Sequence, residues 1–315
     1  MFTIQTAVTI VTAGLASSLF GITDNMVIWS LIITITCYII LLLGKYQILD
    51  KMIKIIILIL AITTIFSTGV ASINTDEIYS FKQIFPSGSG LVFLVAFMGW
   101  MPAPLDISIW HSIWTLEKKK SQKITAKESI FDFNVGYLAT VILGICFVSL
   151  GALVMYNSGI SFSNSGSIFA GQLIELYTSN LGDSFYLIIS ICAFTTMLST
   201  TITCLDASPR TMSRATQLLT KNNDKNYYFH WISALAIGTM LIFYFLLSEM
   251  GALVELATVL SFITAPFYAI LNYKLIMSDN MPKSHKPSKN LRILSVTGIF
   301  FLSFFALGYI LTRFI

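Results

Sequence analysis

Charged residues are scarce in this chain. Of its 315 residues, 11% are charged, whereas 56% are hydrophobic and the mean hydropathy is +0.80. A soluble domain carries about 25% charged residues, so this composition excludes a water-soluble globular protein. Runs such as MIKIIILILAITTIFSTGV (52–70) do not alternate between polar and apolar residues, which argues against membrane-spanning β-strands. The composition therefore predicts an all-α polytopic membrane protein.

Residues that bind metals or act as nucleophiles in enzymes are also few. The chain has three histidines and four cysteines, and no two cysteines have CxxC spacing. The cysteines all lie in apolar runs, which indicates small buried packing residues: they are Cys37, Cys146, Cys192 and Cys204. No G-x-G-x-x-G, P-loop, H-E-x-x-H or G-x-S-x-G motif is present. We predict that the chain is not an enzyme, holds no resident cofactor and binds no nucleic acid.

What the chain does contain is a series of apolar runs of about 20 residues, the length that crosses a bilayer as a helix. Nine such runs are predicted, and together they form a single transmembrane domain, residues 1–315. Their approximate bounds are 3–20, 26–44, 52–71, 90–116, 133–156, 184–205, 230–248, 251–273 and 292–312. The connection at 157–183 has no Lys or Arg and is predicted to be external.

Lysine and arginine fall on alternate connections between these spans. Of the 19 basic residues, all but Lys82 and Arg313 follow the second, fourth, sixth or eighth span, within 45–54, 118–127, 210–225 and 274–292. Cytoplasmic loops carry the excess of Lys and Arg. This pattern predicts a plasma-membrane protein with a cytoplasmic N-terminus and an external C-terminus.

The fourth span contains residues that a transmembrane helix normally avoids. Pro102 and Pro104 lack an N–H, and each proline ring clashes with a preceding carbonyl. A break at 101–105 would leave nearby carbonyl oxygens without helical partners, which is tolerated only where protein or water lines them. Free carbonyl oxygens are also what a cation site needs. Asp106 follows the break, and two interpretations stay open: it caps the second half-helix, or it holds a cation or relays a proton.

Other polar residues inside the spans have both a local and a functional interpretation. His111 is either a packing histidine or a proton relay. The sixth span carries hydroxyl residues on one helical face, namely Thr196, Ser199, Thr200 and Thr203. These hydroxyls either bond to the backbone one turn earlier or to a neighbouring helix, or they line a hydrated pathway.

Three segments are similar to a known family: MPAPLDISIWHSIWTLEKKK (101–120), LLLGKYQILDKMIKIIILIL (41–60) and FDFNVGYLATVILGICFVSLGALVMY (131–156). On these segments the chain resembles the Nramp (natural resistance-associated macrophage protein) divalent metal transporters, whose sixth helix is broken at a Met-Pro-His stretch. The resemblance implies an inverted-repeat, leucine-transporter-like bundle with the site at the broken helix. It also implies a metal-site role for Met101 or Ala103, in addition to the role that the break itself suggests for Asp106.

The chain departs from the family pattern at the break. The histidine of Met-Pro-His is replaced by Ala103, and a second proline follows. A register that places Ala103 at the metal-facing position resembles the magnesium-transporting branch, in which the methionine is replaced by a small residue. Thioether sulfur favours soft transition metals, whereas oxygen ligands and retained water suit Mg²⁺.

A second departure is that the Asp-Pro-Gly-Asn stretch of the family's first helix is absent. Matching the nine spans to helices three to eleven of the family leaves the first two helices without a counterpart, so we expect an N-terminally truncated chain. We predict a secondary transporter for Mn²⁺, Fe²⁺ or Mg²⁺ in the lipid bilayer, with protons as the family's usual coupling ion. The alternatives are an amino-acid or other organic-substrate transporter of the same fold, and a non-transporting truncated membrane protein.

Overall fold

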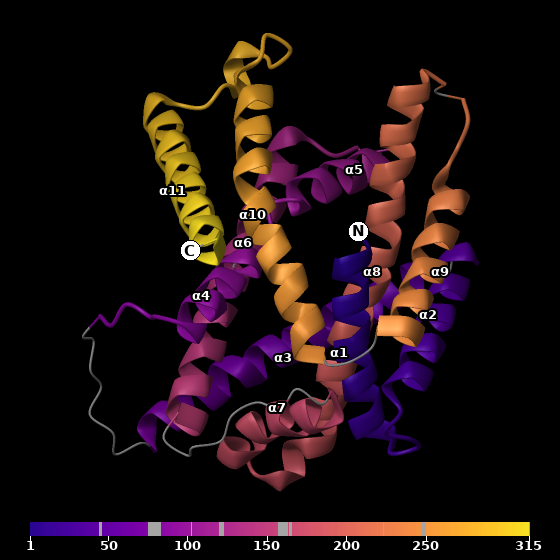
Figure 1. Cartoon of the computed structure of the whole chain (residues 1–315), viewed down its shortest axis with the longest axis vertical. Helices are drawn as coiled ribbons and strands as arrows, with labels where there is room; N and C mark the ends of the chain where they lie inside the picture. The colour runs from indigo at the N-terminus through magenta and orange to yellow at the C-terminus, as the bar shows by residue number, and fades with distance from the viewer. Residues whose placement is uncertain are drawn as a thin grey trace. The chain divides into compact units, whose positions relative to one another are not determined.

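The computed structural model describes residues 1–43, 46–74, 83–101, 103–119, 123–156, 163, 166–222, 224–246 and 250–314. These residues form helices and connections, and none of them lies in a β-strand (Figure 1). The α-helices are α1 (Phe2–Phe20), α2 (Met26–Leu42), α3 (Tyr46–Ile73), α4 (Ser89–Trp100), α5 (Ile107–Lys119), α6 (Ala126–Leu150), α7 (Gly166–Leu181), α8 (Tyr186–Thr220), α9 (Tyr228–Leu246), α10 (Met250–Met277) and α11 (Lys289–Phe314).

Among the described residues, seven helices are long and apolar enough to cross a membrane, and α2 and α4 are shorter apolar helices. These helices confirm the predicted all-α architecture and fit a polytopic membrane protein. Helices α3 and α6 begin six and seven residues before the predicted spans at 52–71 and 133–156, and the predicted span at 90–116 is divided into α4 and α5. Further differences occur at α7 and α8.

Helix α7 replaces part of what was predicted as a plain connection at 157–183. Its 16 residues, GSIFAGQLIELYTSNL, are too few and too polar to mark a transmembrane span. One face of α7 is nevertheless buried, including Ile174 and Tyr177, and Tyr177 forms a hydrogen bond with Thr64 of α3 at 3.0 Å. Burial of this face stabilises α7, and hydropathy alone does not detect it.

The second difference is the length of α8, which continues to Thr220 although the predicted span ends at 205. Apolar runs report the part of a helix that matches the bilayer, not where the helix ends. Pro209 lies inside α8 and removes one backbone donor. Two contacts cross this position: Arg210 forms an ion pair with Asp206 one turn earlier at 2.7 Å, and Thr211 Oγ1 donates to the Ala207 carbonyl at 2.9 Å.

Several helices begin or end where the sequence provides a cap. Asn25 precedes α2 and its side chain accepts from the N–H groups of Val27 and Ile28. Thr125 and Glu128 form a reciprocal capping box at the start of α6. Gly21 ends α1 in a left-handed conformation, with φ at 61°.

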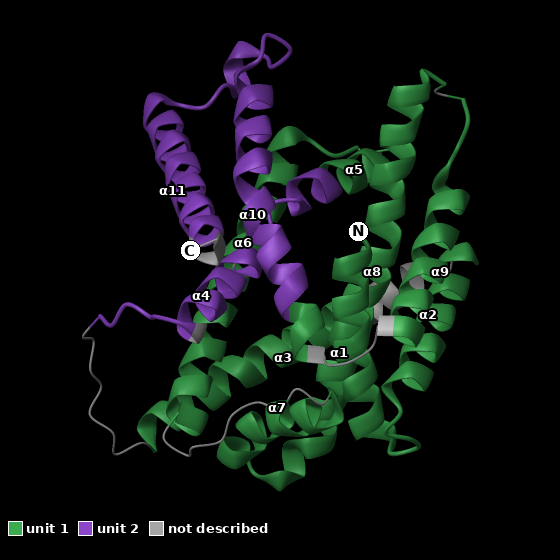
Figure 2. Ribbon diagram, viewed as in Figure 1, with its two compact units in different colours: residues 1–81, 112–254 green, residues 82–111, 255–315 purple. Residues whose placement is uncertain are grey.

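The chain divides into two compact units (Figure 2). Unit 1 comprises Met1–Phe81 and Ser112–Val254, and unit 2 comprises Lys82–His111 and Glu255–Ile315. In unit 1, helices α1, α2, α8 and α9 pack together around one core. Its buried apolar residues are Ala13, Ala16, Trp29, Ile33, Cys37, Ile202, Leu205, Ile232, Leu235 and Ala236. Cys37, Cys192 and Cys204 are buried and unbonded to other cysteines, as predicted, whereas Cys146 is half-buried and so departs from the prediction.

Unit 1 also contains a close approach between helix backbones. A Cβ atom added to Gly14 of α1 would collide with the carbonyl oxygen of Gly166, the first residue of α7. Because the obstacle is backbone, it has no rotamer by which to move away. Small residues let helices approach closely in membrane proteins, and here glycine lets α7 pack against α1.

Unit 2 contains α4, the start of α5, most of α10, and α11. Val95 of α4, Phe262 of α10, and Ala306 and Tyr309 of α11 form its buried core. Gly99 allows the end of α4 to reach the α10 backbone, because a Cβ at this position would collide with the Thr258 carbonyl oxygen.

We predict that Gly14→Ala destabilises the protein because the new methyl group forces α7 away from α1. Overpacking of this kind costs about 1–3 kcal/mol, which thermal unfolding in detergent micelles would detect as a lower midpoint. Gly69→Ala is the matched control, since Gly69 is helical and a Cβ there meets nothing within 4 Å. Equal midpoints for the two variants would contradict the close packing of α1 and α7.

Candidate functional site

The candidate site lies where the fourth predicted span is interrupted. Helix α4 ends at Trp100, and Met101 is extended, with φ −108° and ψ 130°. Helix α5 begins at Ile107, whose N–H donates to the Pro104 carbonyl at 3.2 Å. Ala103 to Asp106 are not helical, and Pro102 lies outside the described residues. Because a proline has no N–H, the carbonyls of Met98 and Trp100 receive no helical bond from residues 102 and 104.

Helix α10 holds both sides of this interruption within unit 2. Before it, Trp100 Nε1 donates to Ser261 Oγ at 3.1 Å. After it, Asn272 Nδ2 donates to Ser108 Oγ at 2.9 Å, and the same Ser108 oxygen donates to the Leu105 carbonyl at 2.8 Å. Of these three bonds, the one from Ser108 gives a partner to a backbone carbonyl, as an interrupted helix requires. The other two join side chains and connect α10 to both sides of the interruption.

Asp106 lies directly before the first residue of α5. Its side chain is half-buried, and its Oδ1 atom is buried without a hydrogen-bond partner among the described residues. The carboxylate also interacts electrostatically with Tyr268 of α10. A buried carboxylate oxygen without a donor is costly, and a bound cation or a proton would relieve that cost.

The other residues predicted at the break are close to it in sequence. Met101 and Ala103 are half-buried. His111 is half-buried on α5 and has interaction partners, so it is not a free imidazole. In the part of the chain that the structure describes, no three His, Cys, Asp or Glu side chains gather as a metal-binding group. A metal at this break would therefore depend on the Asp106 carboxylate, backbone carbonyls and water.

The predicted hydroxyl face of α8 belongs to unit 1. Thr200 Oγ1 donates to the Thr196 carbonyl at 3.1 Å, as the local interpretation predicts. Thr196 Oγ1 is buried and has no partner among the described residues. Ser199 and Thr203 are half-buried. A pathway-lining role for this face stays a prediction.

The main polar contact between α1 and α8 involves a threonine that lies off this face. Thr201 Oγ1 lies 2.8 Å from Thr12 Oγ1 of α1, and the Thr201 carbonyl accepts from Gln5 Nε2 at 3.4 Å. Gln5 is 1% exposed, and its Oε1 has no partner among the described residues. The threonine spacing along the first span was the available signal for this contact.

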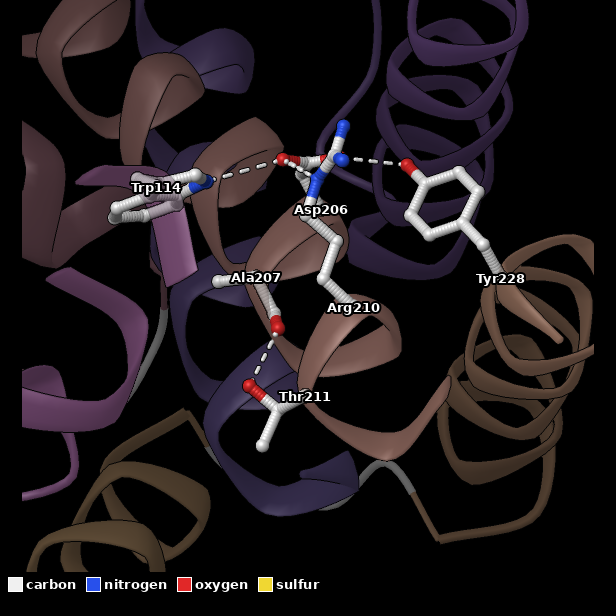
Figure 3. Close-up of polar contacts among 6 residues, drawn as sticks. All are labelled: Trp114, Asp206, Ala207, Arg210, Thr211 and Tyr228. Atoms are coloured by element: carbon white, nitrogen blue, oxygen red, sulfur yellow. Dashed lines mark hydrogen bonds and ion pairs between the residues drawn. The ribbon is translucent and has the colours of Figure 1, made fainter. Parts of the chain in front are cut away.

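The buried polar cluster around Asp206 was not predicted from the sequence (Figure 3). Asp206 is 9% exposed, and its carboxylate accepts from Trp114 of α5, Arg210 of α8 and Tyr228 of α9. The signal that could have found it is the Asp206–Arg210 spacing of four residues, which favours an ion pair on a helix. It was missed because Arg210 was assigned to a loop.

Comparison with known proteins gives the family. The model for "Natural resistance-associated macrophage protein-like" (Nramp) proteins matches residues 1–312. An uncharacterized protein of Pasteurella multocida is 34% identical over 278 residues, which cover 86% of this chain and 63% of the relative. The chain thus spans less than two thirds of the length of this relative. Because the family model matches nearly the whole chain, the chain belongs to the Nramp family.

Proposed function

We propose that this chain acts in the transport of a divalent metal ion across the membrane, with the interruption between α4 and α5 as part of the metal site. Nramp proteins are transporters of divalent metal ions and not enzymes. The observation that carries the proposal is the buried, unpartnered Oδ1 of Asp106 beside interrupted helix backbone.

The chemistry of the break favours a cation over an anionic or zwitterionic substrate. The first N–H groups of a half-helix can bind a substrate carboxylate, but here Asp106 precedes them and would repel it. Carbonyl oxygens whose helical donors are replaced by proline add negative potential at the same place. Both features attract a positive ion, so an organic substrate is the less favoured alternative.

Among divalent ions we propose Mg²⁺ as the preferred cargo. In one of the two registers that the resemblance allows, Ala103, which carries no donor atom, takes the position of the family's sulfur ligand. Mg²⁺ keeps several of its waters and needs only one or two protein carboxylates. Mn²⁺ and Fe²⁺ gain more from imidazole and thioether ligands. Proton coupling would then not require His111.

The topology proposed for this function follows from the basic residues. The loops after α2, α5, α8 and α10 face the cytoplasm of the plasma membrane, and the C-terminus is external. The distribution of Lys and Arg supports this orientation. In that orientation the end of α5 with Lys118 and Lys119 is cytoplasmic, and Asp106 lies deeper in the membrane.

We predict that Asp106→Asn weakens Mg²⁺ binding at least about tenfold, because a charge-assisted contact worth roughly 1.5–3 kcal/mol is lost. Titration calorimetry of the purified chain would measure binding, and Mg²⁺ uptake into liposomes would measure transport. Asp224→Asn is the control, since Asp224 is exposed in a connection. Unchanged binding in Asp106→Asn would leave the carboxylate as a helix cap. Uptake of amino acids but not of metal would favour the alternative substrate.

We predict that Ala103→Met shifts selectivity from Mg²⁺ toward Mn²⁺ by about tenfold, equivalent to ~1.4 kcal/mol of differential binding. Competition between the two ions in the same binding and uptake assays would measure the shift. Met101→Leu is the paired control, because it removes the thioether already present beside the break. If Met101→Leu lowers Mn²⁺ binding and Ala103→Met changes nothing, Met101 is the metal-facing residue and the preference for Mg²⁺ is wrong.

A further inference from the structure

We propose that Asp206 is a positioning residue whose carboxylate latches the second half of α5 onto α8, and that release of Trp114 lets this half of α5 leave α8 during transport. The placement of the latch rests on contacts within unit 1 alone. Only its use during transport rests on the proposed function.

Asp206 receives donors from three helices (Figure 3). Its Oδ2 accepts from Trp114 Nε1 of α5 at 3.2 Å and from Arg210 Nε of α8 at 2.7 Å. Its Oδ1 accepts from Tyr228 Oη of α9 at 2.6 Å. One carboxylate therefore connects α5 to the packed core of α1, α2, α8 and α9.

These three contacts differ in strength in a way that suits a reversible latch. The bonds from Arg210 and Tyr228 are short, and the first pairs opposite charges, whereas the indole donor is neutral and its bond is longer. When Trp114 leaves, Asp206 keeps an ion pair and a hydrogen bond, so no buried charge is left unpaired. The α5 contact can thus open without disturbing the α8–α9 contacts.

The two retained partners also hold each other. The Arg210 guanidinium lies over the Tyr228 ring, 5.0 Å from its centroid. This contact fixes Arg210 and Tyr228 in place around Asp206, so that the Oδ2 atom stays oriented to accept the indole N–H again.

Helix α5 buries little of its surface. No residue of α5 is buried, whereas the residues of α8 from Cys204 to Pro209 all are. A helix without a buried face depends more on individual polar contacts. We therefore expect loss of the hydrogen bond from Trp114 to Asp206 to loosen this half of α5 locally.

Hydrogen exchange measured by mass spectrometry tests the latch on the full chain in detergent micelles, without metal. Trp114→Phe removes the indole donor and keeps an aromatic ring. Loss of a hydrogen bond to a charged group should raise exchange of the amides at 112–119 by about tenfold. Trp231→Phe is the matched control, because it removes an indole bond of 2.9 Å to Thr216 Oγ1 that joins α9 to α8 and does not involve α5.

Asp206→Asn and the double variant complete the test. If Asp206 acts through Trp114, the double variant exchanges at 112–119 no faster than the faster single variant. Additive effects, or the same acceleration in Trp231→Phe, would overturn the latch, as would unchanged exchange in Trp114→Phe. If Asp206→Asn does not fold, the comparison of exchange at 112–119 between Trp114→Phe and Trp231→Phe still tests the latch. If the exchange pattern is as expected but the chain transports no metal, the latch is supported and the proposed function is contradicted. If the chain transports metal but exchange is unchanged in Trp114→Phe, only the latch is contradicted.

Discussion

The pairing of backbone N–H and carbonyl groups is the constraint on which the rest of this structure depends. In hydrocarbon each unpaired group costs several kcal/mol by the usual estimates, so a membrane helix is interrupted only where other protein groups or water replace the lost bonds. Between Trp100 and Ile107, the Leu105 carbonyl accepts from Ser108 Oγ, and α10 contacts side chains on both sides of the interruption. Ser261 and Asn272 bind the two sides of the interruption, and Gly99 brings α4 against the α10 backbone. The break and the polar residues of α10 that contact its two sides are close in space, although about 160 residues separate them in sequence.

This dependence explains how far the sequence could predict the fold. Apolar runs located most helices because hydropathy directly reports the match to the bilayer, and the prolines marked the interruption because their effect is local. Helix α7 and the end of α8 were missed because both are stabilised by contacts that hydropathy does not measure. Tyr177 is buried against α3, and the Asp206–Arg210 pair spans Pro209. Likewise, nothing in the sequence connects Asn272 with Ser108, since that pairing exists only once α10 packs beside the break.

The two carboxylates in the α5 region illustrate how partners distinguish chemical roles. Asp206 has three donors for its two oxygens, including a guanidinium, so its charge is already compensated. Asp106 has a buried oxygen for which the described residues supply no donor. A carboxylate whose two oxygens both accept hydrogen bonds stabilises contacts between helices, whereas a buried oxygen without a donor favours the binding of a cation or a proton. Asp106 was predicted as a site residue because it follows the break. The sequence does not distinguish a helix cap from a metal ligand, because that distinction depends on which hydrogen-bond donors lie near the carboxylate oxygens.

Helix α5 follows Asp106 directly and carries Trp114, so these two environments are joined along the chain by this helix. Asp106 and Trp114 are eight residues apart, about 12 Å along a helix. A ligand shifts a conformational equilibrium only by the difference in its affinity for the two states. A metal that binds Asp106 more tightly when α5 is in one position would therefore bias the Trp114 contact, and the Trp114 contact would bias metal affinity by the same factor. A weak contact suits that exchange, because a latch much stronger than the difference in the binding energy of one hydrated ion between the two states would never open.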